Sequence, residues 1–266
     1  MRFFLLFTLI FSLNLDAAEL NRESYWDGLK TSFTYLLKGA SLQFQEKNNL
    51  AYASVAAPVL WFSFNEDKRI SKNARLKTIP KYMQLTSDLS PVLGLPLVSL
   101  ATYSYGLKNN NSTMIQFAEE YFASLYLAFA ESALLSLVYI HERPSTEHLS
   151  KVETSFRGKS SFPSGHVIPY ATLAFKTFQF YGPYTAILPT ALLFLTSVQR
   201  VRDGKHYLSD IVGGVFLSAF SSEGVRSAAH FSGNDSTYKF IFERNFTVGY
   251  VEHEGTVGPK ITFDWN

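Results

Sequence analysis

Apolar residues recur at helical spacing along most of this chain. From Trp26 to Gln45 they follow one helix face, and from Leu50 to Phe64 the chain is more uniformly apolar. A charged, basic loop is expected from Glu66 to Lys81. The pattern predicts further helices. The one over 114–141 is expected to be the longest, and the one over 89–107 to be kinked by Pro91 and Pro96. These helices are expected over residues 89–107, 114–141, 164–181, 184–201 and 209–226.

The pattern changes to alternation near the C-terminus. Apolar side chains from Tyr238 onward mostly alternate with polar neighbours, and Glu254-Gly255 is suited to a turn. The stretch is too short for a barrel. The fold class is therefore expected to be all-α, a helical bundle with a short C-terminal β-hairpin-like tail.

The N-terminus resembles a secretory signal. Arg2 is followed by the apolar run from Phe3 to Leu13, and small residues at Ala17 and Ala18 suit cleavage. The run is short for a membrane span, which takes about 20 residues, although an uncleaved anchor is the alternative. We expect a signal peptide over residues 1–18, an N-terminal helical region over 19–88, a helical core over 89–230 and a β-rich tail over 236–266.

Composition narrows the function. The chain has 266 residues, of which 47% are hydrophobic and 17% charged, and its net charge is +2 without basic clusters, so we expect no nucleic-acid partner. It has no cysteine, which excludes disulfides and thiolate metal sites. Export indicates the periplasm or the cell-envelope membrane. Three charge-free stretches favour membrane association, whereas Glu119, Glu120 and Glu131 would be costly against lipid.

The segment Pro163-Ser164-Gly165-His166 has the composition of an anion site. If a helix begins at Ser164, its first amides lack partners within the helix and its dipole favours an anion. Gly165 allows close approach of the backbone, and His166 would lie beside the anion. The alternative is ordinary helix capping by serine.

A second group follows in Arg200, His206 and Asp210. Across one helical turn Asp210 would meet His206 and accept a hydrogen bond from one ring nitrogen, leaving the other nucleophilic. Arg143, placed at the end of the long helix, could hold phosphate through paired N–H groups. Each has an ordinary alternative: a surface histidine beside a helix-start aspartate, and an arginine at a helix C-terminus.

Taken in order, these motifs resemble the type-2 phosphatidic acid phosphatase and vanadium haloperoxidase superfamily. The chain matches Pro-Ser-Gly-His completely, and it matches the final motif in Arg200, His206 and Asp210, with Gln199 in place of serine. It also matches the Arg-Pro of the first motif. That motif's lysine should occupy position 136, where the chain has Ser136. Lys159 and Lys205, which flank motif residues, are the candidates to replace its charge.

The resemblance implies a role for each residue. His206 would attack phosphorus and form a phosphohistidine, Asp210 would orient it, and His166 would protonate the leaving oxygen. The phosphate oxygens would be held by Arg143, Arg200, Ser164 and Gly165. The resemblance implies a hydrolase of the acid phosphatase or lipid phosphate phosphatase type, without metal or other cofactor, acting on a phosphorylated small molecule or lipid.

Three other readings stay open. The same residues could hold vanadate in a haloperoxidase, and Ser136 is compatible with a degenerate protein that binds phospholipid without turnover. A metal site at His141, Glu142 and His148 is the third, although their spacing fits no familiar zinc pattern.

Overall fold

A computed structural model describes residues 24–75, 78–145, 160–230, 246–253 and 256–263. The expected signal peptide, its cleavage site, and the residues Glu254-Gly255, His148 and Lys159 lie outside these ranges. The described helices are α2 (Tyr25–Leu42), α3 (Lys47–Ala74), α4 (Lys81–Leu93), α5 (Leu97–Lys108), α6 (Ser112–Ser136), α8 (Ile168–Tyr181), α9 (Pro183–Arg202) and α10 (Leu208–Ala229).

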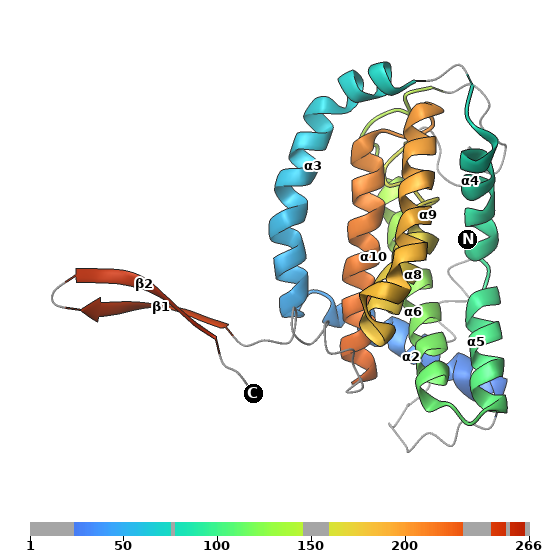
Figure 1. Ribbon diagram of the computed structural model, residues 1–266, viewed down its shortest axis with the longest axis vertical. Helices are drawn as coiled ribbons and strands as arrows, with labels where there is room; N and C mark the ends of the chain where they lie inside the picture. The colour runs from blue at the N-terminus through green and yellow to red at the C-terminus, as the bar shows by residue number, and fades with distance from the viewer. Residues whose placement is uncertain (1–23, 76–77, 146–159, 231–245, 254–255, 264–266) are drawn as a thin grey trace.

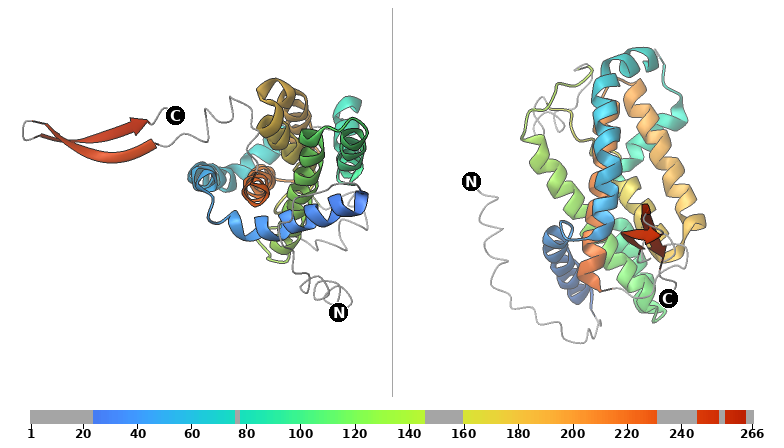
Figure 2. Two further views of the ribbon diagram at one scale, coloured as in Figure 1. Left: turned by 90° about the horizontal axis from the view of Figure 1, so that it is seen from below. Right: turned by 90° about the vertical axis from the view of Figure 1, so that its left-hand side faces the viewer.

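The helices form a bundle around α10 (Figure 1). α10 packs against α2, α3, α6 and α8, and α9 packs against α8. The view from below in Figure 2 shows α2 crossing the end of the bundle, where it contacts both α6 and α10. The all-α prediction is confirmed.

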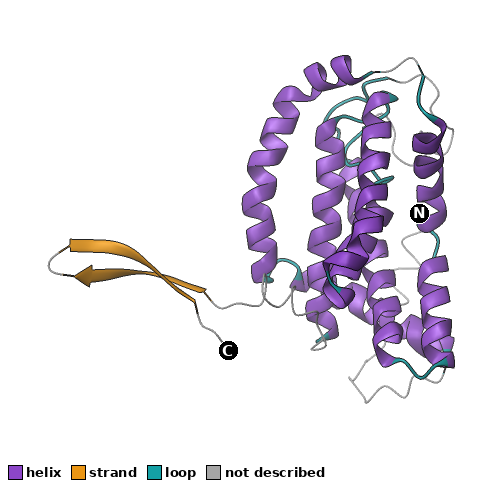
Figure 3. Ribbon diagram, in the orientation of Figure 1, coloured by secondary structure: helices purple, strands orange, loops and turns teal. Residues whose placement is uncertain are grey.

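The C-terminal tail contains the expected hairpin (Figure 3). Strand β1 (Phe246–His253) pairs antiparallel with β2 (Thr256–Phe263), and Phe246 lies opposite Phe263 in the register.

Apolar clusters join neighbouring helices. One cluster joins α6 to α8 through Phe117, Tyr121, Leu125 and Ile168. A second joins α2, α6 and α10. The interior also holds charge, since Lys176 of α8 lies 2.8 Å from Glu120 of α6 and both side chains are fully buried. Glu119 and Glu120 therefore face the bundle interior.

The end of α3 departs from the prediction of a basic loop over 66–81. α3 continues to Ala74 and, at 28 residues, is longer than the 25-residue α6, which was expected to be the longest helix. Asp67 and Ser71 are buried, and Ile70 and Ala74 pack on a cluster around Val201. The packed face of this helix includes Asp67, whereas Lys68, Arg69 and Lys72 are exposed, so the charged residues concealed the helical pattern.

The break between α4 and α5 is sharper than the predicted kink. The two helices meet at 63° around Gly94 to Pro96. Taken together, they have the length and apolar composition of a membrane span, whereas no single helix among the described residues does. Pro96 cannot donate a backbone hydrogen bond, and Gly94 is the C-cap of α4. Gly94 and Pro96, with Leu95 between them, therefore separate two helices rather than bend one.

Two helix ends near the motifs were also predicted wrongly. α6 ends at Ser136 rather than His141, so Arg143 lies in a loop and not at a helix C-terminus. α8 begins at Ile168 rather than Ser164, and the Ser164 amide donates to the carbonyl oxygen of Asp210 at 2.9 Å. After α6, Glu142 bridges to Ser160 and the His141 carbonyl accepts the Ser161 amide. At both ends, contacts between segments far apart in the chain take the place of the helix that local periodicity predicts.

Candidate active site

The predicted contact between His206 and Asp210 is present at the start of α10. The Nδ1 atom of His206 lies 3.1 Å from Oδ2 of Asp210, and both side chains are buried. His206 itself precedes the helix, and Asp210 also accepts the Tyr207 amide at 2.8 Å as part of a capping box. Because the carboxylate faces Nδ1, the hydrogen belongs on Nδ1 and the lone pair on Nε2.

The site keeps His206 neutral and Asp210 ionised. Burial, together with the charges of Arg200 and Arg143, lowers the pKa of His206 to about 3, although Asp210 acts in the opposite sense. Burial works against ionisation of Asp210, but hydrogen bonds from His141 and His206 hold its pKa well below the usual range. At neutral pH, His206 is therefore an uncharged imidazole oriented by a carboxylate.

Both arginines contact the segment that carries His206. Nη1 of Arg143 donates to the Lys205 carbonyl at 3.3 Å, and the Arg200 carbonyl accepts the amides of Lys205 and His206. Both arginines are buried, and both influence the pKa of His206. Arg143 reaches the site from its loop, whereas Arg200 comes from the last turn of α9.

The Pro-Ser-Gly-His segment brings a second imidazole to the site. The ring centroids of His166 and His206 are 6.5 Å apart. The Ser164 hydroxyl is buried and has no hydrogen-bond partner among the described residues. The helix does not begin at Ser164 as predicted: three residues of turn, Gly165 to Val167, precede α8, and the Ser164 amide binds the Asp210 carbonyl oxygen.

Glycines on α10 allow this segment to approach. A Cβ on Gly214 would lie 2.6 Å from the Ser164 carbonyl oxygen, and one on Gly213 would lie 2.5 Å from the Phe162 ring. Backbone of the 162–166 segment thus rests directly on α10.

The structure also adds residues that the sequence motifs missed. His141 Nε2 lies 3.2 Å from the other oxygen of Asp210, and Ser161 donates to that same oxygen at 3.2 Å. Asp67 of α3 accepts both the amide and the hydroxyl of Ser209. The sequence suggests His141 only as a candidate metal ligand. No spacing rule connects it to Asp210, which lies 69 positions later in the chain.

The expected lysine has no evident replacement in the described residues. Ser136 is buried, and its hydroxyl bonds back to the Ala133 carbonyl of its own helix. Lys205 lies 3.1 Å from Asp203. In the part of the chain that the structure describes, no three His, Asp or Glu side chains are grouped so that they could hold a metal ion.

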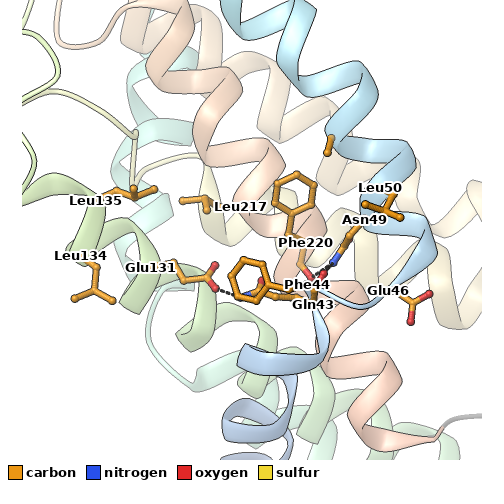
Figure 4. A pocket seen from close by; sticks show the side chains of 11 residues that line it. Gln43, Phe44, Glu46, Asn49, Leu50, Glu131, Leu134, Leu135, Leu217 and Phe220 are labelled. Carbon is orange, nitrogen blue, oxygen red and sulfur yellow. Dashed lines mark hydrogen bonds between the residues drawn. The ribbon is translucent and has the colours of Figure 1, made fainter.

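An apolar cavity of about 450 Å³ lies lower in the bundle (Figure 4). Its walls come from the end of α2, the start of α3, α6 and α10, and include Leu50, Leu135, Leu217 and Phe220. The carboxyl group of Glu131 lies in this lining and accepts a hydrogen bond from Gln43. Burial raises the pKa of Glu131 to about 7, against the effect of that bond. None of the motif residues lines the cavity.

Buried guanidinium groups around a neutral imidazole suit the binding of a dianion such as phosphate. Residues 120–230, which carry all of these motifs, match the family model of the PAP2 superfamily. The match confirms the resemblance drawn from the motifs and supports a phosphatase-type function. Among curated proteins, none matches the chain.

One solved structure is similar over much of the chain. It is the crystal structure of the first transmembrane PAP2-type phosphatidylglycerolphosphate phosphatase from Bacillus subtilis. The identity is 18%, the alignment covers 75% of this chain and 94% of that one, and the TM-score is 0.43.

Proposed function

We propose that the protein is a metal-independent phosphatase of the cell envelope, which hydrolyses a lipid-linked phosphate or pyrophosphate ester through a phosphohistidine. The observation that carries this proposal is the convergence of Arg143, Arg200 and His166 on a neutral His206 that Asp210 orients. Phosphoryl transfer depends on positioning and charge stabilisation, and these are what the site offers.

In the first step Nε2 of His206 attacks phosphorus, and the bond from phosphorus to the leaving oxygen breaks. His166 gives its proton to that oxygen. Water then attacks the phosphohistidine, His166 accepts a proton from the water, and the nitrogen–phosphorus bond breaks to release phosphate. Arg143, Arg200, the Ser164 hydroxyl and the Gly165 amide stabilise the oxygens in both steps.

Two features support an apolar substrate and a place at the membrane. The described surface exposes many large apolar side chains on α3, α4, α5 and α9, among them Trp61, Leu85, Leu100, Tyr184, Leu188 and Phe194. The cavity in Figure 4 borders α6 and α10, the helices that also lead to Ser136 and Asp210. Such a cavity suits an apolar chain. Export, by the signal peptide over residues 1–18, is part of the same proposal.

The domain division is proposed with it: an N-terminal helical region over 19–88, a phosphatase-like core over 89–230 and a β-rich tail over 236–266. The family match from 120 to 230 falls within the core.

The test is release of inorganic phosphate by the purified protein from soluble and lipid phosphates, with and without a chelator. We expect hydrolysis that the chelator leaves unchanged and that His206→Ala abolishes, with lipid phosphates preferred. A phosphorylated intermediate should be trapped in the wild type and be labile in acid, as phosphohistidine is. Full activity in His206→Ala, or loss of activity with chelator, would refute the mechanism.

Ser136 is the one observation that favours a second function, a phosphate-binding protein without turnover. Binding of phosphate compounds with no release of phosphate, even in Ser136→Lys, would establish it. Vanadate tests the haloperoxidase alternative: halide oxidation with added vanadate indicates a haloperoxidase, whereas inhibition of phosphate release by vanadate indicates a phosphatase.

A further inference from the structure

We infer that His141 is a positioning residue, which binds Asp210 as an imidazolium and thereby fixes the carboxylate that orients His206. This inference rests on the proposed function for its kinetic consequence, but its structural part stands without it. His141 belongs to none of the three motifs.

The first argument is the geometry around Asp210. Its Oδ2 atom faces Nδ1 of His206 and the Tyr207 amide, whereas its Oδ1 atom faces Nε2 of His141 at 3.2 Å and the Ser161 hydroxyl at 3.2 Å. Each carboxylate oxygen thus has two donors. With His141 and Ser161 holding one oxygen, the carboxylate cannot rotate away from His206 without breaking hydrogen bonds in a buried site.

The second argument is the charge state of His141. Its Nδ1 atom lies 3.1 Å from the Glu142 carbonyl oxygen, which only accepts, and its Nε2 atom faces an ionised carboxylate, which also only accepts. Both ring nitrogens must carry hydrogen to satisfy these partners. The nearby hydroxyls agree, because Ser161 donates to Asp210 and Ser209 donates to Asp67, which leaves their lone pairs for the ring.

The third argument is the charge balance of the surroundings. The groups that face His141 are the carboxylates of Asp210 and Asp67 and, through a ring contact, Tyr207. Burial lowers the pKa of His141. The hydrogen bond to Asp210, the negative charges of Asp210 and Asp67, and the hydrogen bond to the Glu142 carbonyl act in the opposite direction, and the pKa lies above the ordinary histidine value. The imidazolium therefore sits between two carboxylates, one from α3 and one from α10.

Asp67 anchors this arrangement from a distant part of the chain. It accepts the Ser209 amide at 3.0 Å and the Ser209 hydroxyl at 2.5 Å, and the same hydroxyl lies 3.3 Å from Nε2 of His141. The hydrogen-bonded series Asp67, Ser209, His141, Asp210, His206 thus links α3 to the nucleophile. The consequence is that the loop with Arg143, two residues beyond His141, is tied to the start of α10.

The kinetic test compares His141→Leu with His141→Gln. Leucine removes the donor and the charge, so kcat should fall about 10-fold to 100-fold, as when a hydrogen bond that orients a functional histidine is lost, while KM changes little. Glutamine can still donate to Asp210, so it should recover part of kcat. Two further variants serve as comparisons. Ser161→Ala removes the neighbouring donor to Oδ1 of Asp210 but keeps the His141 ring, and His230→Asn replaces a histidine at the far end of α10.

A second measurement keeps the inference testable if a variant does not fold or the protein releases no phosphate. The ¹⁵N shifts of the histidine rings at pH 7 should show His141 with both nitrogens protonated and His206 with one, assigned by comparison with His141→Gln and His206→Asn. A neutral His141, or an unchanged kcat in a folded His141→Leu protein, would overturn the inference. If wild type releases no phosphate from any ester while His141 is doubly protonated, the proposed function fails and the placement of His141 stands.

Discussion

Asp210 and Ser136 show how single residues shape this site. Asp210 accepts hydrogen bonds from four groups, so a carboxylate in a dry interior stays ionised. Ser136 ends α6 with its hydroxyl bonded to Ala133, where the superfamily motif has a lysine. The charge balance of the site is thus set by few side chains, and adding one cation should be measurable.

We expect Ser136→Lys to strengthen phosphate binding. A new charge-assisted hydrogen bond to the substrate would contribute about 1.5–3 kcal/mol, which corresponds to a roughly 10-fold to 100-fold lower KM. A cation at the last residue of α6 is also favoured by the helix dipole. Steady-state kinetics with one phosphate ester measure the effect, and Ser136→Met is the control of similar length without charge. Equal KM values for the two variants would place position 136 out of reach of the substrate.

At the scale of elements, α6 and α10 carry both the polar interior and the apolar cavity. Lys176 of α8 binds Glu120 at 2.8 Å and the Ser222 carbonyl of α10 at 2.9 Å, so one ammonium joins three helices. Further along α10, Leu217 and Phe220 face the cavity. The two features lead to separate predictions, one on stability and one on substrate length.

Lys176→Met should destabilise the fold by about 3–5 kcal/mol, because it leaves Glu120 buried without its partner. Removing the second charge as well, in Glu120→Leu with Lys176→Met, should restore most of the loss. Chemical denaturation of Lys176→Met, of Glu120→Leu and of the double variant against wild type gives the free energies of unfolding. Additive losses in the double variant would show that the pair is not coupled.

Leu217→Trp should fill part of the cavity and shorten the apolar chain that it can hold. We expect kcat/KM for a long-chain lipid phosphate to fall several-fold, and activity on a short soluble phosphate to stay near the wild-type value. Leu188→Trp, on the exposed face of α9, is the matched control. An equal loss on both substrates would mean that the cavity does not hold the substrate chain.

For the whole molecule, the bundle combines a polar interior with an apolar exterior. Glu119, Glu120 and Glu223 are buried, whereas Trp61, Leu188 and many other large apolar side chains are exposed. A buried carboxyl group with a shifted pKa makes the stability of the fold depend on pH. Glu131, in the cavity lining, provides a test of this link.

Wild-type stability should contain a contribution that falls as pH rises from about 4.5 to 7. In the folded protein the pKa of Glu131 is raised to about 7, so its side chain stays protonated in this window. In the unfolded chain the same group has its ordinary pKa of 4.5 and is ionised. Glu131→Gln removes the titration and keeps an acceptor for Gln43. The difference in free energy of unfolding, variant minus wild type, should therefore increase by roughly 2–3 kcal/mol as the pH rises through this window. A difference independent of pH would contradict the raised pKa.

The amino-acid sequence by itself determined most of the helices, the C-terminal hairpin and the identity of the motif residues, because helical periodicity and short motifs are local properties. It predicted the contact between His206 and Asp210, which are four positions apart. It could not predict where α6 ends, where α8 begins or that α3 extends to Ala74, since each of these depends on contacts between segments that are far apart in the chain. Only the tertiary structure brought Asp67 to Ser209, 142 positions away, and His141 to Asp210. Hydrogen bonds between buried groups so far apart in the chain arise from packing, which no local pattern records.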